Sequence, residues 1–571
     1  YWLSPIIDFG RELYVPWQLA SGKKLYEEIA YIHGPLSPYF NAAVFRLFGV
    51  NLQSIVIANL FILGLITILT FNIIESYAGR ISGYSAVYVF LVVFSFNQLN
   101  DLASFNFICP YSHEMTHGIL LNLASLWAFS SYFLKNKNLL YFTTGSFFLG
   151  LLFLTKVEMF FAGFCSTIIF FIIILWKEKY PAEKIINLAL VFFGTLIVPV
   201  LLFFMFLSRN SDISWGVYGI LGGWKYLFNN DVVNTYFQSH IMGIENLSQN
   251  LGQLLKGILW TCILILPAYL FSIAHQYFKK RIKNIYFVLA CAIFCIYYVF
   301  LFFVLIINGW SVIIRSFPVV ILIFSGILIF NIIKNEDNYK KMLAAFYFGI
   351  FSFFLFLRII FAVRIDHYGF ALAFPGTVLI VTILLHYIPS WLNNHKKDSL
   401  IFRFVAFSIV VAFCTHFFLI SNNYYNEKTA QVSTDNAVFY ETPEMANLIN
   451  KTVHQIKITV EAGETLLVVP EGVIFNFLTG IANPLRQEVF IPPAFALWSE
   501  QELVNQLINE KPDHILLIHR TTYEYGKPVF GKDYAKEFFK IIINNYQPNV
   551  LLGARPFTGS QFGMQFFKKN D

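Results

Sequence analysis

Charged residues are scarce in this chain of 571 residues: Asp, Glu, Lys and Arg make up 13% of it, and hydrophobic residues make up 57%. Soluble globular proteins carry roughly 25% charged and 45–50% apolar residues. The composition therefore excludes a soluble globular protein and indicates a polytopic α-helical membrane protein. The net charge of +7 calls for no nucleic-acid partner, because membrane proteins carry excess Lys and Arg in their cytoplasmic loops.

The short motifs that hold nucleotides are also missing. The sequence contains no P-loop, no GxGxxG and no Asp-x-Asp of the kind that holds the metal of a nucleotide-sugar. We expect this of an active site outside the cell, where nucleotide donors are not available. An internal repeat is absent as well, which disfavours a transporter, because many transporters are built from repeated halves. The six cysteines lie in or beside apolar segments, so we expect no disulfide framework.

Long apolar runs dominate the first three quarters of the chain. Twelve of them approach the roughly 20 residues that a helix needs to cross the hydrocarbon layer. These runs are 52–74, 83–99, 115–134, 139–155, 158–176, 186–207, 256–278, 285–307, 312–333, 342–361, 368–388 and 400–420. The chain opens on Tyr1 without a methionine or a signal peptide, so we expect a preceding span and thirteen spans in the intact protein.

The connections between these runs alternate in charge. Basic residues mark the loops near Arg80, Lys135–Lys137, Lys177–Lys184, Lys279–Lys283, Lys334–Lys341 and Lys396–Lys397. Basic loops face the cytoplasm, and an even number of spans places the N-terminal segment and the C-terminal region together on the opposite face. The sequence thus predicts a multi-pass protein of the cell membrane (inner or plasma) whose active site and C-terminal domain are extracytoplasmic.

The composition changes again near residue 421, and we expect three parts: a first outer loop over 1–51, a transmembrane domain over 52–421, and an extracytoplasmic α/β domain over 422–571. Buried strands at 465–470 and 514–519 alternate with helices at 499–510 and 533–546. Ligands tend to bind at the carboxyl ends of such strands. The candidates there are Pro470, Glu471 and Asn476, and the alternative is a turn and helix start without a ligand.

The segment from Asp8 to Gly49 is the longest part of the membrane region that is neither a span nor a short polar loop. Its residues 11–21 and the stretch that begins at Pro38 each predict a short helix. Tyr14 and Trp17 are residue types that settle at a membrane–water boundary. We therefore expect both helices to lie along the membrane surface, with the Asp8 carboxylate at their head.

The sequence His113-Glu114-Met115-Thr116-His117 is the sharpest short motif. On a helix, His113 and His117 share a face, and this spacing can hold zinc while Glu114 activates water. Three interpretations remain open: a protease, a metal or substrate contact in another kind of enzyme, and polar residues that are paired at a helix start. Position 120 is leucine, which departs from the extended HExxHxxGxxH form.

Ionisable residues at membrane depth are costly and are therefore paired or functional. Several lie at the predicted outer face, and a cavity with several cations and a carboxylate suits a phosphate-bearing substrate. The alternative for each one alone is an ion pair or a side chain that reaches the membrane surface. The predicted substrate-binding residues are Arg11, His113, Lys156, Arg315, Arg364, His367 and Tyr368.

Taken together, the Asp8 segment, the outer loop that ends in His113-Glu114, a dozen spans and an outer α/β domain resemble the GT-C glycosyltransferases. The phrases HGPLSPYFNA, CPYSHEMTHG, DHYGFALAFP and PEGVIFNFLTG are similar to family 39, the group of protein O-mannosyltransferases and bacterial aminoarabinose transferases. The resemblance covers nearly the whole chain as architecture, while its motifs are loose. Asp8 is followed by Phe9 where the family often has an acidic residue.

The resemblance implies transfer of a sugar from a polyprenyl-phosphate donor to a lipid, glycan or protein acceptor, with inversion at the anomeric carbon. Asp8 would then be the catalytic base, and Lys156, Arg315 and Arg364 would face the phosphate. Glu114, the second catalytic candidate, would orient the acceptor or hold a divalent metal together with His113 and His117. The alternatives are a zinc intramembrane protease of the HExxH kind and a lipid or polysaccharide transporter.

Overall fold

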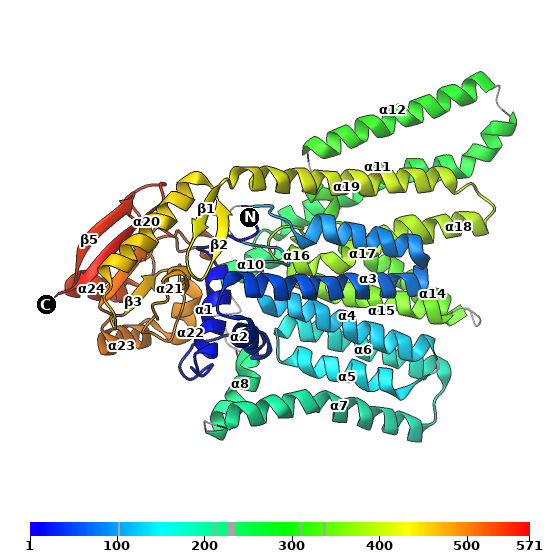
Figure 1. Cartoon of the computed structure of the whole chain (residues 1–571). Helices are drawn as coiled ribbons and strands as arrows, with labels where there is room; N and C mark the ends of the chain where they lie inside the picture. The colour runs from blue at the N-terminus through cyan, green and yellow to red at the C-terminus, as the bar shows by residue number, and fades with distance from the viewer. Residues whose placement is uncertain are drawn as a thin grey trace.

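Long parallel and antiparallel helices form most of the molecule, and a smaller α/β domain packs at one end of them (Figure 1). The structure is a computed structural model, and it describes residues 1–100, 103–135, 137–209, 212–225, 235–281, 284–308, 310–334 and 339–570. The polytopic membrane fold with a C-terminal α/β domain, expected from composition and apolar runs, is confirmed.

The helices between the N-terminal segment and the α/β domain follow the predicted apolar runs. They are α3 (Leu52–Val89), η1 (Phe90–Ser95), α4 (His113–Leu134), α5 (Leu139–Phe153), α6 (Val157–Glu178), α7 (Ala182–Ser208), α8 (Ile213–Lys225), α10 (Tyr236–Met242), α11 (Leu247–Arg281), α12 (Asn284–Asn308), α13 (Ser311–Ile314), α14 (Phe317–Lys334), α15 (Tyr339–Phe356), η3 (Leu357–Ile359), α16 (Gly369–Leu372), α17 (Phe374–Thr382), η4 (Ile383–Tyr387), α18 (Ile388–Asn394) and α19 (Leu400–Glu427).

Within the described ranges, nine helices are long and apolar enough to cross a membrane. The first, Leu52–Ser95, holds two predicted spans that meet at a kink at Gly79. The other two predicted spans are α4, which opens with His113 and Glu114, and α5, whose 15 residues cover only about 22 Å at 1.5 Å per residue. The second predicted span ends at Ser95 rather than at residue 99, because the helix stops there.

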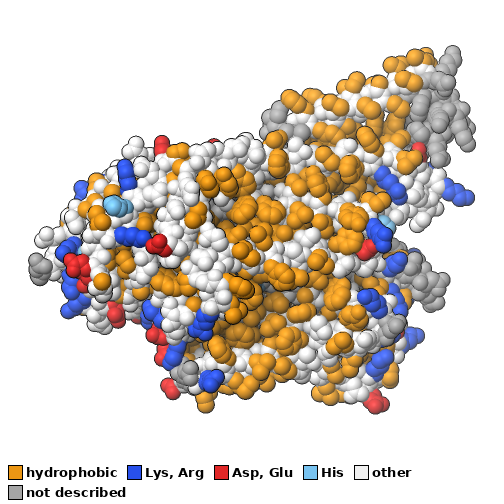
Figure 2. All heavy atoms as spheres, viewed as in Figure 1, with side chains coloured by type: hydrophobic (Ala, Val, Ile, Leu, Met, Phe, Trp, Pro, Cys, Tyr) orange, Lys and Arg blue, Asp and Glu red, His pale blue; other side chains and the backbone are white. Residues whose placement is uncertain are grey.

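The two ends of the helical region differ in charge. On the face that Figure 2 shows, apolar side chains cover the helices, and Lys and Arg side chains gather at the end that lies away from the α/β domain. The connections α4–α5, α6–α7 and α18–α19 lie at that end (Figure 1). The side chains of the predicted basic loop Lys279–Lys283 fall outside the described residues.

Two short helices precede the first span. Helix α1 (Phe9–Ala20) and helix α2 (Leu36–Phe48) match the predicted pair, although α2 begins two residues before Pro38. Helix α1 runs across the direction of α3 and lies between the spans and the α/β domain (Figure 1). An added Cβ at Gly10 would lie 2.7 Å from the backbone nitrogen of Ile474, so α1 contacts this domain at backbone distance.

The C-terminal elements are β1 (Ala430–Ser433), β2 (Val438–Glu441), α20 (Pro443–Thr459), β3 (Leu466–Val469), α21 (Ile474–Thr479), α22 (Pro492–Trp498), α23 (Glu500–Glu510), β4 (His514–Ile518), η5 (Tyr523–Tyr525), α24 (Lys536–Asn545), β5 (Tyr546–Gly553) and β6 (Gly563–Lys569). One sheet has the order β3-β4-β6-β5, and β1 and β2 form a separate antiparallel pair. Strands β3 and β4 are parallel, whereas β6 is antiparallel to β4 and β5.

The predicted strands and helices of this domain are present, but four strands were missing from the prediction: β1, β2, β5 and β6. The parallel pair lies between helices and is buried at every position, so its apolar runs were visible in the sequence. Strand β5 is mostly exposed and lies at the sheet edge, where no apolar run is needed. The division at residues 51 and 421 stays a prediction, and α19 continues past 421 to Glu427.

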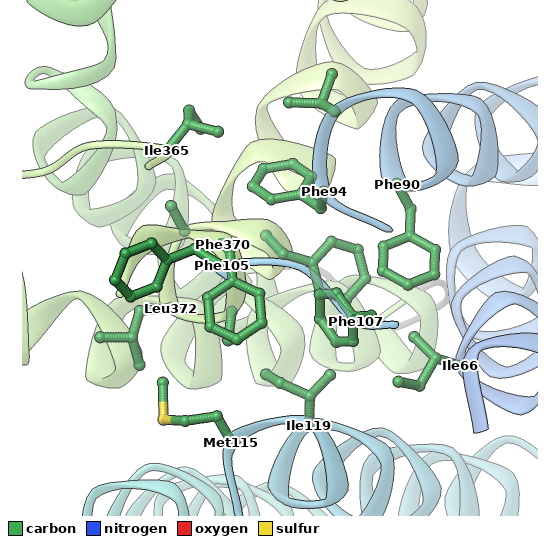
Figure 3. Packing of buried hydrophobic residues seen from close by; sticks show 14 of the residues in the cluster. Ile66, Phe90, Phe94, Phe105, Phe107, Met115, Ile119, Ile365, Phe370 and Leu372 are labelled. Carbon is green, nitrogen blue, oxygen red and sulfur yellow. The ribbon is translucent and has the colours of Figure 1, made fainter. Parts of the chain in front are cut away.

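A cluster of aromatic rings lies between the spans and the outer loop (Figure 3). The ring centroids of Phe107 and Phe370 are 5.3 Å apart, and those of Phe90 and Phe374 are 4.4 Å apart. These rings join η1, the loop before α4, and helices α16 and α17. This packing fixes the loop that carries Tyr111 against the segment that carries Tyr368.

Candidate active site

Asp8 lies where the N-terminal segment turns into α1. Its φ of 60° and ψ of −57° are in the left-handed region, and the Phe9 N–H donates to the Ile7 carbonyl at 2.7 Å. A hydrogen bond across one residue with these angles is a γ-turn of the positive-φ kind, which is rare and strained. Such strain costs about 1–3 kcal/mol and persists only where the surrounding structure holds it.

The α/β domain supplies the neighbours of this turn. The Asp8 N–H donates to Glu471 Oε1 at 3.0 Å, and Arg520 Nε donates to Glu471 Oε2 at 2.9 Å. Burial, and after it the Glu471 carboxylate, raise the pKa of Asp8 to about 7, against the opposing charges of Arg11 and Arg520. Asp8 is therefore divided between its protonated and ionised forms near neutral pH.

Arg11 and Glu12 connect α1 to the start of α4. Arg11 pairs with Glu12 at 3.3 Å and donates to the Tyr111 carbonyl at 3.1 Å. Glu12 Oε2 accepts from the backbone N–H of His113 at 2.9 Å and from its ring Nδ1 at 2.6 Å. Glu12 and His113 are both buried, so this pairing fixes the position of α1 over the N-terminal end of α4.

Lys156 lies in the turn between α5 and α6. Its Nζ donates to the Tyr111 hydroxyl at 3.3 Å and is 3.5 Å from the Glu158 carboxylate. The ammonium group also lies over two rings, 5.3 Å from the centroid of Tyr111 and 5.4 Å from that of Tyr368. An ammonium group over aromatic faces is attracted to them electrostatically, so this lysine is held in place although it is buried.

Gly34 brings the N-terminal segment to this turn. Its N–H donates to the Thr155 carbonyl at 2.7 Å, and the Leu36 N–H donates to the Leu154 carbonyl at 3.0 Å. A Cβ at position 34 would lie 2.2 Å from the Leu154 oxygen, which no side chain tolerates. The glycine of the HGP sequence is therefore required for the close approach that places Lys156 beside this segment.

Five side chains form what we name the Tyr111 cluster: Tyr111, Lys156, Arg358, His367 and Tyr368. The ring of Tyr368 contacts most of the others. Its centroid is 5.0 Å from the ring of Tyr111, 4.4 Å from that of His367 and 5.8 Å from the guanidinium carbon of Arg358. The cluster thus joins residues from three segments that are far apart in the sequence.

Electrostatic effects join Asp8 to this cluster. Burial is the largest cause that raises the pKa of Tyr111, and the negative charge of Asp8 adds to it. Burial likewise lowers the pKa of His33, and the positive charges of Lys156 and Arg11 lower it further. A carboxylate and two cations from separate elements therefore act on the same region.

The two remaining predicted cations differ in their surroundings. Burial, and after it the charge of Arg364, lower the pKa of His367 to about 3, so Arg364 lies at the edge of the Tyr111 cluster. Arg315 donates to Asn250 Oδ1 at 2.9 Å and to the Phe361 carbonyl at 2.7 Å. In the part of the chain that the structure describes, no contact joins Arg315 to the cluster, so the prediction that it lines the same site has no support here.

The predicted metal set of His113, Glu114 and His117 does not fit a metal ion. Both ring nitrogens of His113 are engaged, Nδ1 by Glu12 and Nε2 by the Asn59 amide at 3.0 Å. The Glu114 carboxylate accepts from the hydroxyls of Tyr31 and Ser112, and His117 Nδ1 is 3.0 Å from Ser37 Oγ. Among the described residues, no group of three His, Cys, Asp or Glu could hold a metal. His117 Nε2 is buried and has no hydrogen-bond partner among the described residues, so one nitrogen of the motif stays unengaged.

Part of this chain is similar to a known protein family. Residues 32–203 match the family described as dolichyl-phosphate-mannose-protein mannosyltransferase. The match covers less than a third of the chain, and it includes Gly34, Tyr111, the HExxH sequence and Lys156. The resemblance to GT-C enzymes read from the sequence is confirmed.

Two solved structures are similar to this chain. The oligosaccharyltransferase AglB of Archaeoglobus fulgidus is 10% identical, with 100% of this chain and 71% of that chain covered and a TM-score of 0.45. ArnT from Cupriavidus metallidurans, bound to undecaprenyl phosphate, is 11% identical, with 99% of this chain and 94% of that chain covered and a TM-score of 0.44. At such low scores these similarities assign no residue and no substrate to this chain. Among curated protein sequences, none matches it.

Sequence reasoning missed several residues of this candidate site. Glu12 and Tyr111 were not selected, because their roles depend on contacts between α1 and the loop before α4. Arg520 was missed although it follows β4 as Glu471 follows β3. The signal was available, since parallel neighbouring strands place their carboxyl ends at one edge. Asn476, by contrast, donates to the carbonyls of Leu466 and Ile481. These hydrogen bonds agree with the alternative interpretation of this region, a turn and a helix start without a ligand.

Proposed function

We propose that this transferase moves a sugar from a polyprenyl-phosphate donor to a hydroxyl or amine of a lipid, glycan or protein, with inversion, on the extracytoplasmic face of the cell membrane. The observation that carries the proposal is Asp8: a partly buried carboxyl group with a pKa of about 7, in a strained turn next to the Tyr111 cluster. The matched family's name supports the donor class, because it specifies a dolichyl-phosphate sugar.

Asp8 acts as the general base in this proposal. Its ionised carboxylate takes the proton of the acceptor O–H or N–H as the oxygen or nitrogen forms a bond to the anomeric carbon. The bond from that carbon to the phosphate oxygen breaks on the opposite face, and polyprenyl phosphate leaves with the bonding electron pair. A base with a pKa near the working pH is best matched to such a transfer.

The leaving phosphate needs cations, because negative charge develops on it as the bond breaks. Lys156 and Arg358 of the Tyr111 cluster are suited to this, with Arg364 at its edge and Arg11 beside Asp8. Arg315 is the weaker candidate, since its guanidinium already donates to Asn250 and Phe361. No step of the proposed reaction is assigned to Glu114, whose carboxylate is occupied by Tyr31 and Ser112.

The direct test supplies purified protein with radiolabelled polyprenyl-phosphate sugars and with lipid, glycan and protein fractions as acceptors. Asp8→Asn should lower turnover on the order of 10²–10⁴-fold. The matched control is Asp435→Asn, because Asp435 is an exposed carboxylate of the α/β domain that pairs with Lys457. In the wild type, turnover should rise with pH as Asp8 ionises, with a midpoint near its pKa of about 7.

Equal turnover by Asp8→Asn and the wild type would remove the assigned base. Turnover that falls equally in Asp435→Asn would show a general effect on folding rather than a loss of chemistry.

A further inference from the structure

The α/β domain presents a charged pair to Asp8 from one edge of its sheet. Strands β3 and β4 are parallel, and Val469 pairs with Leu517 in register. Glu471 and Arg520 each stand two residues beyond the end of their strand. Because the carboxyl ends of parallel strands meet at one edge, these side chains meet there and form an ion pair at 2.9 Å.

Further hydrogen bonds hold the ion pair of Glu471 and Arg520 in place. Arg520 also donates to the Glu524 carboxylate and to the Thr521 carbonyl. Glu471 is 2% exposed and Arg520 is 9% exposed, so neither side chain is free to leave the contact. A buried carboxylate held in this way keeps one oxygen for the Asp8 N–H, at 3.0 Å.

The N–H group that donates to Glu471 belongs to Asp8, the residue with the strained backbone. A backbone with a φ of 60° and a ψ of −57° reverts to an ordinary conformation unless a contact holds it. The γ-turn brings the Ile7 carbonyl and the Phe9 N–H together and so determines the direction in which the Asp8 side chain leaves the chain.

We propose that Glu471 and Arg520 are positioning residues of the transferase: from the carboxyl edge of β3 and β4, they hold Asp8 in its γ-turn and set the direction of its carboxylate. The α/β domain is then a working part of the active site rather than an appended lobe. This inference rests on the proposed role of Asp8, and it adds residues that act through Asp8 and do not touch the sugar.

Both residues also act on Asp8 through charge, and in opposite directions. Glu471 raises the pKa of Asp8 and Arg520 lowers it. The other titratable or charged groups that face Asp8 come from α1, from the loop before α4 and from η5: Arg11, Glu12, Tyr111 and Tyr525. Removing one member of the pair must therefore shift the titration of Asp8 in a direction that identifies that member.

The experiment measures the pH dependence of sugar transfer by the full-length protein. Glu471→Gln keeps an oxygen that can accept the Asp8 N–H but removes the charge, so the midpoint of the acid limb should move to lower pH. Arg520→Gln should move it to higher pH, and Arg520→Lys should restore the wild-type midpoint. Glu471→Ala removes the acceptor altogether and should cost about tenfold in kcat at pH 8, with the KM for the donor unchanged.

The matched control is Glu464→Gln. Glu464 pairs with His514 at 2.9 Å at the amino end of the same two strands, so this variant removes a comparable carboxylate from the same domain and should keep the wild-type midpoint. The inference is overturned if Asp8→Asn is inactive while Glu471→Gln and Arg520→Gln keep the wild-type midpoint. It is also overturned if both variants shift the midpoint in the same direction.

A second measurement needs no donor and separates this inference from the proposed function. A carboxyl group whose folded-state pKa is raised contributes stability at low pH and loses it as pH rises toward that pKa. The melting temperature of the wild type should therefore fall relative to Asp8→Asn as pH rises from about 4 to about 7, and in a Glu471→Gln background this fall should end at lower pH. If the background has no effect, Glu471 does not act on Asp8, whatever the activity of Asp8→Asn.

Discussion

The cations of the site differ in how much of their hydrogen-bonding capacity the protein already uses. Arg315 donates to Asn250 and Phe361, whereas the Lys156 ammonium makes one long hydrogen bond at 3.3 Å and an ion pair at 3.5 Å. An ammonium group has three donors. Lys156 therefore has capacity left for a phosphate oxygen.

Replacing Lys156 with methionine keeps the length of the side chain and removes its charge. A hydrogen bond to a charged group contributes about 1.5–3 kcal/mol, so we expect Lys156→Met to raise the KM for the polyprenyl-phosphate donor by about 10- to 100-fold. Steady-state kinetics with increasing donor concentration would measure it.

Lys135→Met is the matched control, because the Lys135 ammonium also lies over two rings, 5.9 Å from the centroid of Trp127 and 5.3 Å from that of Tyr141. Lys135 follows α4 at the opposite end of the helices, so this variant should leave the KM unchanged. A similar KM in both variants and the wild type would contradict a phosphate contact by Lys156.

At the scale of residues, the sequence predicted single residues of the site better than it predicted the residues that contact them. Asp8, Lys156 and Tyr368 stand out because polar and ionisable groups are rare at membrane depth, and the structure brings all three to one region. Arg520 lies in a domain rich in charged residues, where its charge alone does not set it apart, and only its place two residues after β4 marks it. The partial separation of Arg315 depends on its contact with the Phe361 carbonyl, which sequence spacing does not reveal.

At the scale of elements, the contact of α1 with α21 couples the membrane region to the α/β domain. Gly10 is the second residue of α1, directly after Asp8-Phe9, and it faces the backbone of Ile474. The same domain carries Glu471, only three residues before Ile474. The close approach of the two helices is thus what allows Glu471 to reach the Asp8 N–H.

We expect Gly10→Ala to separate these helices. The new Cβ would lie 2.7 Å from the Ile474 nitrogen, and a clash with a backbone atom is not relieved by a rotamer change. The variant should lose about 1–3 kcal/mol of stability, which exceeds the roughly 1 kcal/mol that alanine gains over glycine within a helix. Thermal unfolding in detergent, followed with the transfer assay, would show a lower melting temperature and a lower kcat.

Gly64→Ala in α3 is its control. A Cβ at Gly64 meets nothing within 4 Å, so only the gain in helix propensity remains and the melting temperature should stay the same or rise slightly. If Gly10→Ala is as stable as Gly64→Ala, α1 is not fixed by this contact.

Elements were predictable from the sequence where burial imposes a pattern on it. Strands β3 and β4 are buried at every position and read as apolar runs, and the long spans do the same. The residues of strand β5 are mostly exposed at the edge of the sheet, so burial imposes little pattern on them. The long helix Leu52–Ser95 bends at Gly79, between the two spans that the sequence predicted.

At the scale of the whole molecule, the basic connections and the α/β domain lie at opposite ends of the helices (Figures 1 and 2). Helix α1 lies at the same end as the α/β domain (Figure 1). Since Lys and Arg are retained in cytoplasmic loops, this polarity supports an active site on the outer face. A lipid-linked donor fits that face, because a lipid carrier brings a sugar to a compartment that lacks nucleotide donors.

The side of the membrane can be tested with one cysteine at each end. Lys540 in α24 and Lys397 between α18 and α19 are both exposed, and each is replaced by cysteine in a background whose six native cysteines are alanine and which still transfers sugar. A maleimide that does not cross membranes should label Lys540→Cys in intact cells. It should label Lys397→Cys only after the cells are permeabilised, because that loop is expected in the cytoplasm. The reverse pattern would place Asp8 on the cytoplasmic face and remove the reason for a lipid-linked donor.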